Sequence, residues 1–430
     1  MRSFLLAVML LACGNDKGGS PSSPATTPIS TPSRKVVDSS DPPAHFGKRG
    51  ADEPTSPPPA AAPAPAGPGH DFTEEARALL VVGACGVGTP PATVPAKTLA
   101  HHCEVITKAQ ADYLEGWVKK ASAFFDQKVP KGVPKKVVYP FAGGDLSTAL
   151  TVYPDADEIT TLSLEPAGDP RTLATLRGAE LTAALAKVEY ELKFLYRVNF
   201  SNTLNMIDAM RGGALPTQLI FGLSALKLHG YELVALHYFR LDDDGSIHYL
   251  NEDDIRRAPD PKKPGNTERR NFLFANAEVQ FRRPGGRVQV WRHIRANLGN
   301  ETSPGIGPGL KADPRVVRHL ESKGQIAAMT KAASYLLSWD SFSIMRNYLL
   351  KHVQWMVSDA TGVAPKWGKP AGFEYETYGD YIGPHIEAGT GIAKDWKTEF
   401  EAQGRRELAF RFGYYDKKFR NHLVIMKKKA

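Results

Sequence analysis

Two adjacent glycines and two acidic residues have the types and spacing of a nucleotide-binding turn. Gly143 and Gly144 follow the strand-like run VVYP, and Asp145 begins the helix-like run DLSTAL. Glycines at such a turn let the backbone approach a phosphate, and the helix start offers free amides. A second strand-like run ends at Glu165, where an acid can bind ribose hydroxyls. With Asp359, at another predicted strand end, these residues form a candidate ligand crevice.

The glycine turn does not fit every nucleotide. A dinucleotide-binding turn has a third glycine that is missing here, and the Asp145 carboxylate would stand where a phosphate binds. A cationic sulfonium cofactor would tolerate that acid. The other interpretation is structural, with the glycines serving backbone geometry and Asp145 serving as an N-cap. We favour the structural interpretation and expect no cofactor, so that S-adenosylmethionine belongs to the alternative alone.

Two further clusters contain residue types that bind metal ions, but their residues do not have the spacing of a metal site. His101, His102, Cys103 and Glu104 are adjacent, and adjacent side chains diverge from one ion. The acidic turn at residues 241–245 lacks the ligand spacing of a calcium loop. We therefore predict no metal site.

A third cluster resembles the nucleophile patterns of acyl transfer. Lys331, Ser334 and Tyr335 supply the residue types, but their order and spacing do not fit. We predict a helix here, on which Lys331 and Tyr335 share a face. Asp359 has a second interpretation as an Asx turn into Gly362. The catalytic residues, if the chain is an enzyme, stay unassigned.

The first residues indicate export. Arg2 precedes a short apolar run, which is typical of a signal peptide, and the run ends in LLAC at residues 10–13. These four residues resemble the bacterial lipobox, whose cysteine is lipidated and becomes the first residue. We expect a signal peptide over residues 1–12 and acyl chains, palmitate among them, on Cys13. Residues 13–70, rich in proline, alanine and serine, are expected to form a disordered tether. This predicts a lipid-anchored protein of the bacterial cell envelope, at the outer membrane or cell surface.

The remaining cysteines, Cys85 and Cys103, form an even pair once Cys13 carries the lipid. Outside the cytoplasm such a pair usually oxidises, so we predict a disulfide. Two buried thiols are the alternative.

The formal net charge is +8 over 430 residues. The basic runs ERRNF, FRRPGGR and WRHIR alternate with apolar residues, which predicts one solvated basic face. Outside the cytoplasm, anionic glycans or lipid headgroups suit such a face, and we expect no nucleic-acid partner. The oligomeric state stays open.

The elements that must position these residues mix helices and strands. Residues 71–136 predict a helical segment with helices at 71–86 and 108–129, and residues 137–430 predict the main body. The body is expected to contain strands at 137–141, 158–165 and 355–358, hairpins at 231–250 and 276–294, helices at 169–211 and 215–230, a mainly helical stretch at 324–353, and a final hairpin joining 407–415 to 422–429. This order predicts a mixed α/β fold, with a Rossmann-like sheet surrounded by helices and carrying β-hairpin insertions.

Two resemblances follow from these runs. The order of elements resembles the Rossmann-like fold of S-adenosylmethionine-dependent methyltransferases, including an antiparallel hairpin at the C-terminus. The runs YPFAGGDL, ITTLSLEPAGDPR and MVSDATGVAP more closely resemble a family of bacterial lipoproteins and secreted proteins. That resemblance implies kinship with the family but does not indicate an activity. GACG and AHHCEV are similar to its N-terminal part, which supports pairing of Cys85 with Cys103.

Two classes of function remain. The first is a binding or structural module held on a long tether. The alternative is a methyltransferase-like enzyme, active or degenerate, with a cofactor crevice at the 142–145 loop and Glu165.

Overall fold

A computed structural model describes most of the chain beyond the N-terminal segment. The described residues are 69–199, 215–260, 262–263, 267–302, 307–359, 362–381, 392–413 and 421–429. The predicted signal peptide, Cys13, nearly all of the predicted tether and residues 200–211 of the predicted helical stretch lie outside them. None of the described helices is long and apolar enough to cross a membrane.

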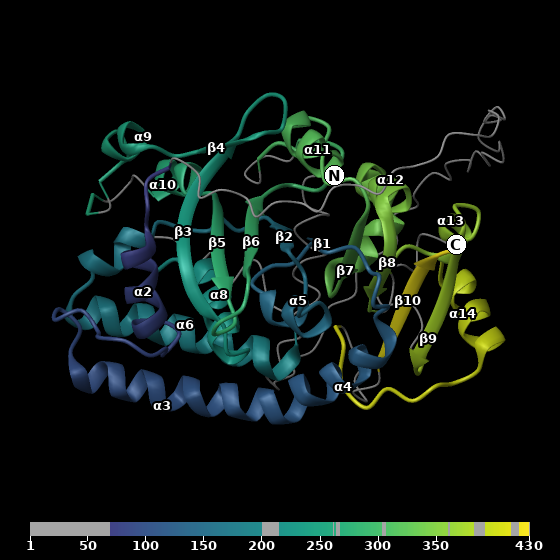
Figure 1. Ribbon diagram of the computed structural model, residues 1–430, viewed down its shortest axis with the longest axis horizontal. Coiled ribbons are helices and arrows are strands. Elements are labelled where there is room, and N and C mark those ends of the chain that lie inside the picture. Colours follow the sequence, from purple (N-terminus) through teal and green to yellow (C-terminus); the bar gives the residue numbers. More distant parts are fainter. Residues whose placement is uncertain are drawn as a thin grey trace, which may run out of the picture. The chain divides into compact units, whose positions relative to one another are not determined.

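A ten-stranded mixed sheet runs through the body, in the order β4-β3-β5-β6-β2-β1-β7-β8-β10-β9 (Figure 1). The strands are β1 (Lys136–Pro140), β2 (Glu158–Ser163), β3 (Glu232–Leu241), β4 (Ile247–Tyr249), β5 (Asn276–Arg282), β6 (Val288–Arg295), β7 (Ile326–Thr330), β8 (Val353–Ser358), β9 (Phe373–Gly379) and β10 (His422–Lys428).

The centre of this sheet is parallel and its two ends are antiparallel. Strands β6, β2, β1, β7 and β8 run parallel to one another. At one end β10 lies antiparallel between β8 and β9, and at the other β5, β3 and β4 continue the sheet as antiparallel hairpins. This arrangement confirms the Rossmann-like α/β fold with β-hairpin insertions.

Helices cover both faces of the sheet. They are α2 (Thr73–Val82), α3 (Ala96–Tyr113), α4 (Lys119–Lys128), α5 (Leu146–Val152), α6 (Gly178–Val198), α8 (Thr217–Leu228), α9 (Glu252–Arg256), α10 (Thr267–Leu273), α11 (Pro314–Glu321), α12 (Ser343–His352), α13 (Pro365–Gly368) and α14 (Ile392–Gln403). Gly222 of α8 packs directly on Trp291 of β6, since a Cβ there would lie 2.0 Å from the ring. The next residue of β6, Arg292, points to the opposite face, where Lys323 lies just after α11.

The predicted helix over residues 324–353 is wrong at its start. The run IAAMT forms β7, all of whose residues are buried between β1 and β8. Periodicity cannot separate a short apolar strand of this kind from a buried helix. The helix of this region is α12, which begins at Ser343 after two short 3-10 turns. Lys331 and Tyr335 therefore do not share one helix.

The predicted final hairpin is also wrong in its pairing. Strand β10 pairs with β9 and β8, and the described part of its expected partner, residues 407–413, is not in a strand. The missed strand, FEYETYG, buries Phe373, Tyr375 and Thr377 on alternate positions. That alternation is the signal by which the sequence could have shown it.

Strand β9 is one edge of the sheet, and a side chain covers part of it. The backbone N–H of Thr377 donates to Oε1 of Gln403 (3.2 Å), and Nε2 of Gln403 donates to the carbonyl oxygen of Tyr375 (3.0 Å). Gln403 is the last residue of α14. The helix therefore satisfies two backbone groups of the edge strand.

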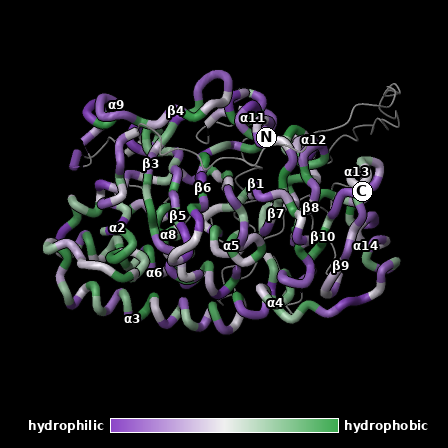
Figure 2. Tube along the Cα trace, in the orientation of Figure 1, coloured by the Kyte–Doolittle hydropathy of each residue, from purple (hydrophilic) through white to green (hydrophobic). Residues whose placement is uncertain are grey.

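A long helical layer lies outside the sheet. Helix α3 packs along α6, and its turns alternate between hydrophobic and hydrophilic residues (Figures 1 and 2). A five-residue π-helical turn, Leu114–Val118, joins α3 to α4. The rings of Tyr113 and Trp117 stack there with their centroids 5.2 Å apart. This turn places two aromatic side chains, four residues apart, on the same side.

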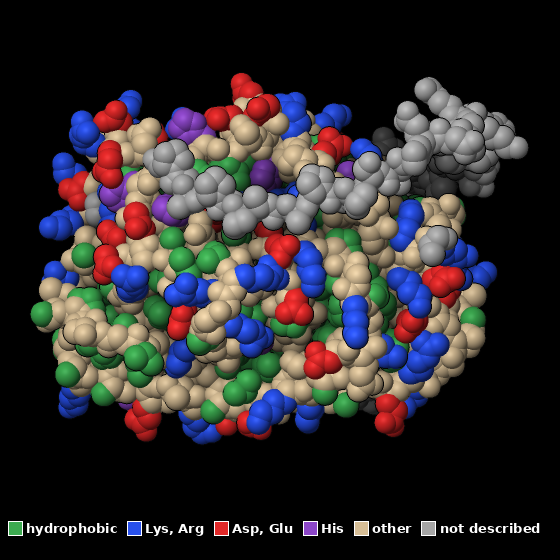
Figure 3. Space-filling model, viewed as in Figure 1, with side chains coloured by type: hydrophobic (Ala, Val, Ile, Leu, Met, Phe, Trp, Pro, Cys, Tyr) green, Lys and Arg blue, Asp and Glu red, His purple; other side chains and the backbone are tan. Residues whose placement is uncertain are grey.

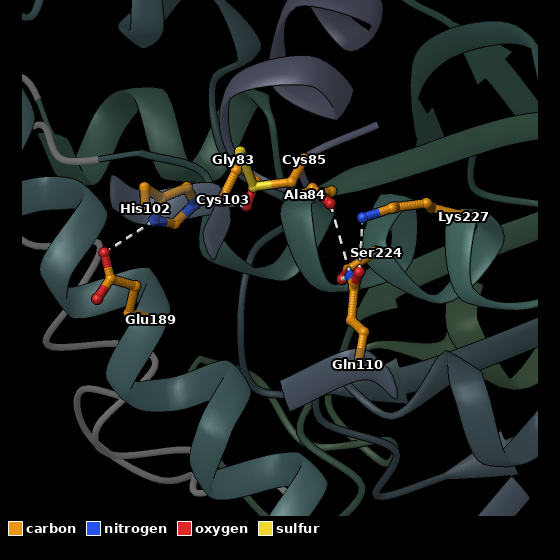
Figure 4. The surroundings of a disulfide bond; sticks show 9 residues. All are labelled: Gly83, Ala84, Cys85, His102, Cys103, Gln110, Glu189, Ser224 and Lys227. Carbon is orange, nitrogen blue, oxygen red and sulfur yellow. Dashed lines mark hydrogen bonds and ion pairs between the residues drawn. A yellow bond between two sulfur atoms is a disulfide. The ribbon is translucent and has the colours of Figure 1, made fainter. Parts of the chain in front are cut away.

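A disulfide fastens the start of this layer. The sulfur atoms of Cys85 and Cys103 are 2.16 Å apart, which joins the loop after α2 to α3 as the sequence predicted (Figure 4). Beside it, the buried ring of His102 lies 3.0 Å from the Gly83 carbonyl oxygen and 3.0 Å from the Glu189 carboxylate. The imidazole thus ties the disulfide segment to α6, and it is a structural residue.

Candidate functional site

Four charged residues follow the carboxyl ends of four neighbouring parallel strands. Glu165 follows β2, Asp145 follows β1, Lys331 follows β7 and Asp359 follows β8. The strand order reverses beside β1, because the chain continues from β1 to β2 on one side and β7 joins on the other. In open α/β sheets, ligands bind outside the carboxyl ends of the strands at such a point. The fold therefore places these residues at the edge where a site is expected.

Asp145 caps α5, as the structural interpretation predicted, and its carboxylate also contacts Tyr139 and Lys331. Its Oδ1 accepts from the Thr148 backbone N–H (3.3 Å) and hydroxyl (2.8 Å). Its Oδ2 accepts from the Tyr139 hydroxyl (3.0 Å) and lies 2.5 Å from the Lys331 amine. The turn before it needs Gly143, whose φ is +52°. The acceptor positions of this buried carboxylate are therefore all used within the protein.

Lys331 completes the pair and is itself fully surrounded. The acceptors of its three N–H groups are Asp145 (2.5 Å), the Thr148 hydroxyl (2.6 Å) and the Asn199 side-chain oxygen (3.1 Å). The rings of Trp117 and Phe412 have their centroids 5.6 Å from the amine. Burial lowers the pKa of Lys331, and the neighbouring carboxylate opposes that shift. A carboxylate, two oxygen acceptors and two aromatic faces are what proteins use to hold a cation.

The backbone around this pair is strained. Phe141, just after β1, has φ of +60°, and Ala332, just after β7, has φ of +62°. Both are residues with a Cβ, for which such angles are unfavourable. Asp359 stabilises the second turn, because its carboxylate accepts from the Ala332 N–H (2.8 Å) and from the Ser334 hydroxyl. Asp359 thus serves to position the loop that carries Lys331, and strain of this kind gathers at functional sites.

Gln218 and His293 join the glycine turn to Glu165. Nε2 of Gln218 lies 2.7 Å from the Gly143 carbonyl oxygen and 3.1 Å from Nδ1 of His293. Nε2 of His293 lies 2.7 Å from the backbone oxygen of Glu165. A carbonyl oxygen can only accept, so Nε2 carries the proton and Nδ1 accepts. Burial lowers the pKa of His293 to about 4, which keeps this ring neutral at neutral pH.

The side chain of Glu165 differs from the three other charged side chains at this edge. It is completely buried, yet none of the described residues donates a hydrogen bond to either carboxyl oxygen. The side-chain oxygen of Gln218 is likewise buried without a donor. By contrast, Glu278 is equally buried, but its Oε2 accepts hydrogen bonds from Nε of Arg292 (2.7 Å) and from the hydroxyl of Tyr249 (2.6 Å). Buried polar oxygens are rarely left without donors, and such a group calls for an explanation.

The structure separates the predicted site residues by role. Gly143 and Asp145 are structural, Asp359 holds a loop, and Glu165 alone has its polar atoms unused. Gly144 is not among the residues of positive φ. Sequence reasoning missed the pairing of Asp145 with a lysine far along the chain, and it did not consider Gln218 or His293.

Other places in the described structure offer less chemistry. No group of three or more His, Cys, Asp or Glu side chains that could hold a metal ion occurs among the residues described. A shallow surface hollow is lined by Gly69, His70, Asn251, Glu252 and Asp253. It shares no residue with the edge that carries Glu165.

The chain matches no protein-family model, no curated protein and no solved structure.

Proposed function

We propose that this chain is a lipid-anchored envelope protein whose α/β body binds a nucleoside, with the Glu165 carboxylate receiving the two ribose hydroxyls. One observation carries the proposal: the oxygens of a fully buried carboxyl group have no donor among the described residues. Vicinal hydroxyls would supply one donor to each oxygen. An acid at this place, ending the strand after a glycine turn, is the ribose-binding acid of α/β nucleotide sites.

The neighbours of Glu165 support this assignment. Its backbone is held by His293, which Gln218 connects to the glycine turn, so the acid and the turn are fixed relative to each other. Rigid support of this kind is what a binding residue needs. Because Glu165 is buried, the segments that cover it must move aside when a ligand enters, and association is expected to be slow.

The test uses the full-length protein and a matched pair of ligands. Adenosine, guanosine, cytidine and uridine are titrated calorimetrically, and the nucleoside that binds is compared with its 2′,3′-dideoxy form. We expect the loss of both hydroxyls to weaken binding about a hundredfold or more, because the carboxyl oxygens again lack donors. Equal affinity for the two forms, or no binding of any nucleoside, would refute the proposal.

The lipid anchor is a separate part of the proposal. It rests on LLAC at residues 10–13, and the pairing of Cys85 with Cys103 leaves Cys13 as the third cysteine. A disulfide also fits a protein outside the cytoplasm. We expect mass spectrometry of the membrane fraction to find Cys13 as an acylated first residue, and Cys13→Ser to move the protein to the soluble fraction. A Cys13→Ser protein that stays with the membrane would exclude this anchor.

A methyltransferase-like activity is the second candidate. The observation that favours it is the placement of antiparallel β10 between β8 and β9, which extends the resemblance drawn from the sequence. That activity requires the site to accept the positively charged sulfonium of S-adenosylmethionine. The charged residues at the site therefore affect whether this cofactor can bind.

An anionic glycan or lipid headgroup stays a weaker proposal. On the side of the molecule shown in Figure 3, Lys and Arg side chains are interspersed with Asp and Glu rather than gathered into one basic face. Mixed charges of this kind favour solubility more than attraction to an anionic surface.

A further inference from the structure

We infer that Lys331 makes this site select an uncharged nucleoside over one that carries a positive charge at its 5′ position. The inference rests on the proposed function and specifies the ligand. It follows from what already occupies the place where a ligand cation would bind.

The position of the 5′ group follows from the arrangement of the strands. When the acid after β2 holds the ribose, the 5′ side of a nucleoside lies over the turn after β1, which approaches the 5′ phosphates in nucleotide sites. Here that turn contains Gly143 and Asp145, and Lys331 reaches it from the neighbouring β7. The 5′ group therefore meets the pair formed by Asp145 and Lys331.

This pair leaves nothing for a ligand cation. The Asp145 carboxylate is saturated by Thr148, Tyr139 and Lys331, so it has no position left to accept another donor. The aromatic faces of Trp117 and Phe412 lie over the ammonium of Lys331. The cation-binding groups at the turn after β1 are thus filled by the protein's own lysine.

A charged ligand is consequently penalised. A cation that leaves water without an acceptor loses its hydration with no compensation. An uncharged hydroxyl or thioether does not meet this penalty. The site is therefore poorly suited to a sulfonium, which argues against methyl transfer.

The experiment compares ligands that differ in one charge. The nucleoside that binds best is measured against its 5′-amino-5′-deoxy analogue, which is cationic at pH 7. S-adenosylmethionine and S-adenosylhomocysteine, which differ by one methyl group and one positive charge, form a second pair. We expect wild-type protein to bind the less positive member of each pair about tenfold more tightly or better, because the cation loses hydration without gaining an acceptor. Equal or tighter binding of the cation by wild type overturns the inference and leaves nucleoside binding intact, whereas the absence of all nucleoside binding overturns both.

Variants identify Lys331 as the cause. In Lys331→Met, Asp145 and the two rings are released, and we expect the preference to reverse toward the cation. The double variant Asp145→Asn with Lys331→Met removes both charges, and it should again prefer the neutral ligand. Lys323→Met is the matched control, since Lys323 is a buried lysine paired with Glu158 at the opposite end of β2. An unchanged preference in Lys331→Met, or a reversed one in Lys323→Met, contradicts the assignment. If Lys331→Met does not fold, the wild-type comparison and the double variant still decide the question.

Discussion

Glu165→Met is expected to make the empty protein more stable, although it removes a completely buried residue. The carboxyl oxygens have no donor within the described structure, and a buried polar group without a partner costs about 1–3 kcal/mol. Methionine has similar length, is apolar and adapts to its surroundings. We therefore expect the free energy of unfolding, measured by urea denaturation without ligand, to rise by about 1–3 kcal/mol. Nucleoside binding should be lost in the same variant.

The same change at Glu278 is the control, and its effect should have the opposite sign. Glu278 is equally buried, but Arg292 and Tyr249 donate to it. Removing one partner of a buried ion pair typically costs about 3–5 kcal/mol. Glu278→Met should therefore lower the free energy of unfolding and leave ligand selectivity unchanged. If both variants lose stability to a similar extent, Glu165 has a partner in the empty protein and is not a vacant ligand contact.

Asp145→Ala is expected to cost much more than the loss of a helix cap. An N-cap alone contributes about 1 kcal/mol. Asp145, however, also holds the ammonium of Lys331 at 2.5 Å in the interior, and an unpaired buried charge costs about 3–5 kcal/mol. We expect urea denaturation to show a loss in that higher range. Adding Lys331→Met should recover part of the loss, because the charge that lacks a partner is then gone.

Asp313→Ala separates the two contributions. Asp313 also caps a helix, α11, by accepting from the Arg315 N–H (3.3 Å), and its ionic partner Arg315 is exposed to solvent. Its replacement should cost about 1 kcal/mol, as cap losses do. An Asp145→Ala loss no greater than that of Asp313→Ala would mean that the buried pair contributes little to the fold.

Local patterns predicted much of this fold. Residues close in sequence determine three of its parts. These are the unit of β1, α5 and β2 with Asp145 as the cap of α5, the two hairpins, and helix α8, which ends before Gly230. Turn residues, apolar periodicity and caps are local signals, and a single sequence carries them. Strand β7 could not be recognised in this way, because only its burial between two parallel neighbours distinguishes it from a helix.

The site was less predictable for a different reason. Glu165 could be named from its position after a strand, but its lack of donors depends on every segment that surrounds it. Lys331 lies far along the chain from Asp145 and was expected on a helix, so nothing in the local pattern suggested their pairing. His293 and Gln218 come from a hairpin strand and a helix whose patterns indicate packing alone. Contacts between distant segments are set by topology, which local sequence does not contain.

The contact between Gln403 and strand β9 also limits how the protein can associate. An edge strand with free backbone groups can pair with another chain and so start an aggregate. A carboxamide has the donor and the acceptor of a peptide unit, so Gln403 replaces one residue of an eleventh strand at Thr377 and Tyr375. An approaching chain finds these two groups already in use, and it can extend the sheet there only if the end of α14 is first displaced. The packing of α14 therefore opposes the addition of further strands at this edge. Other proteins protect their edge strands with charged residues or proline.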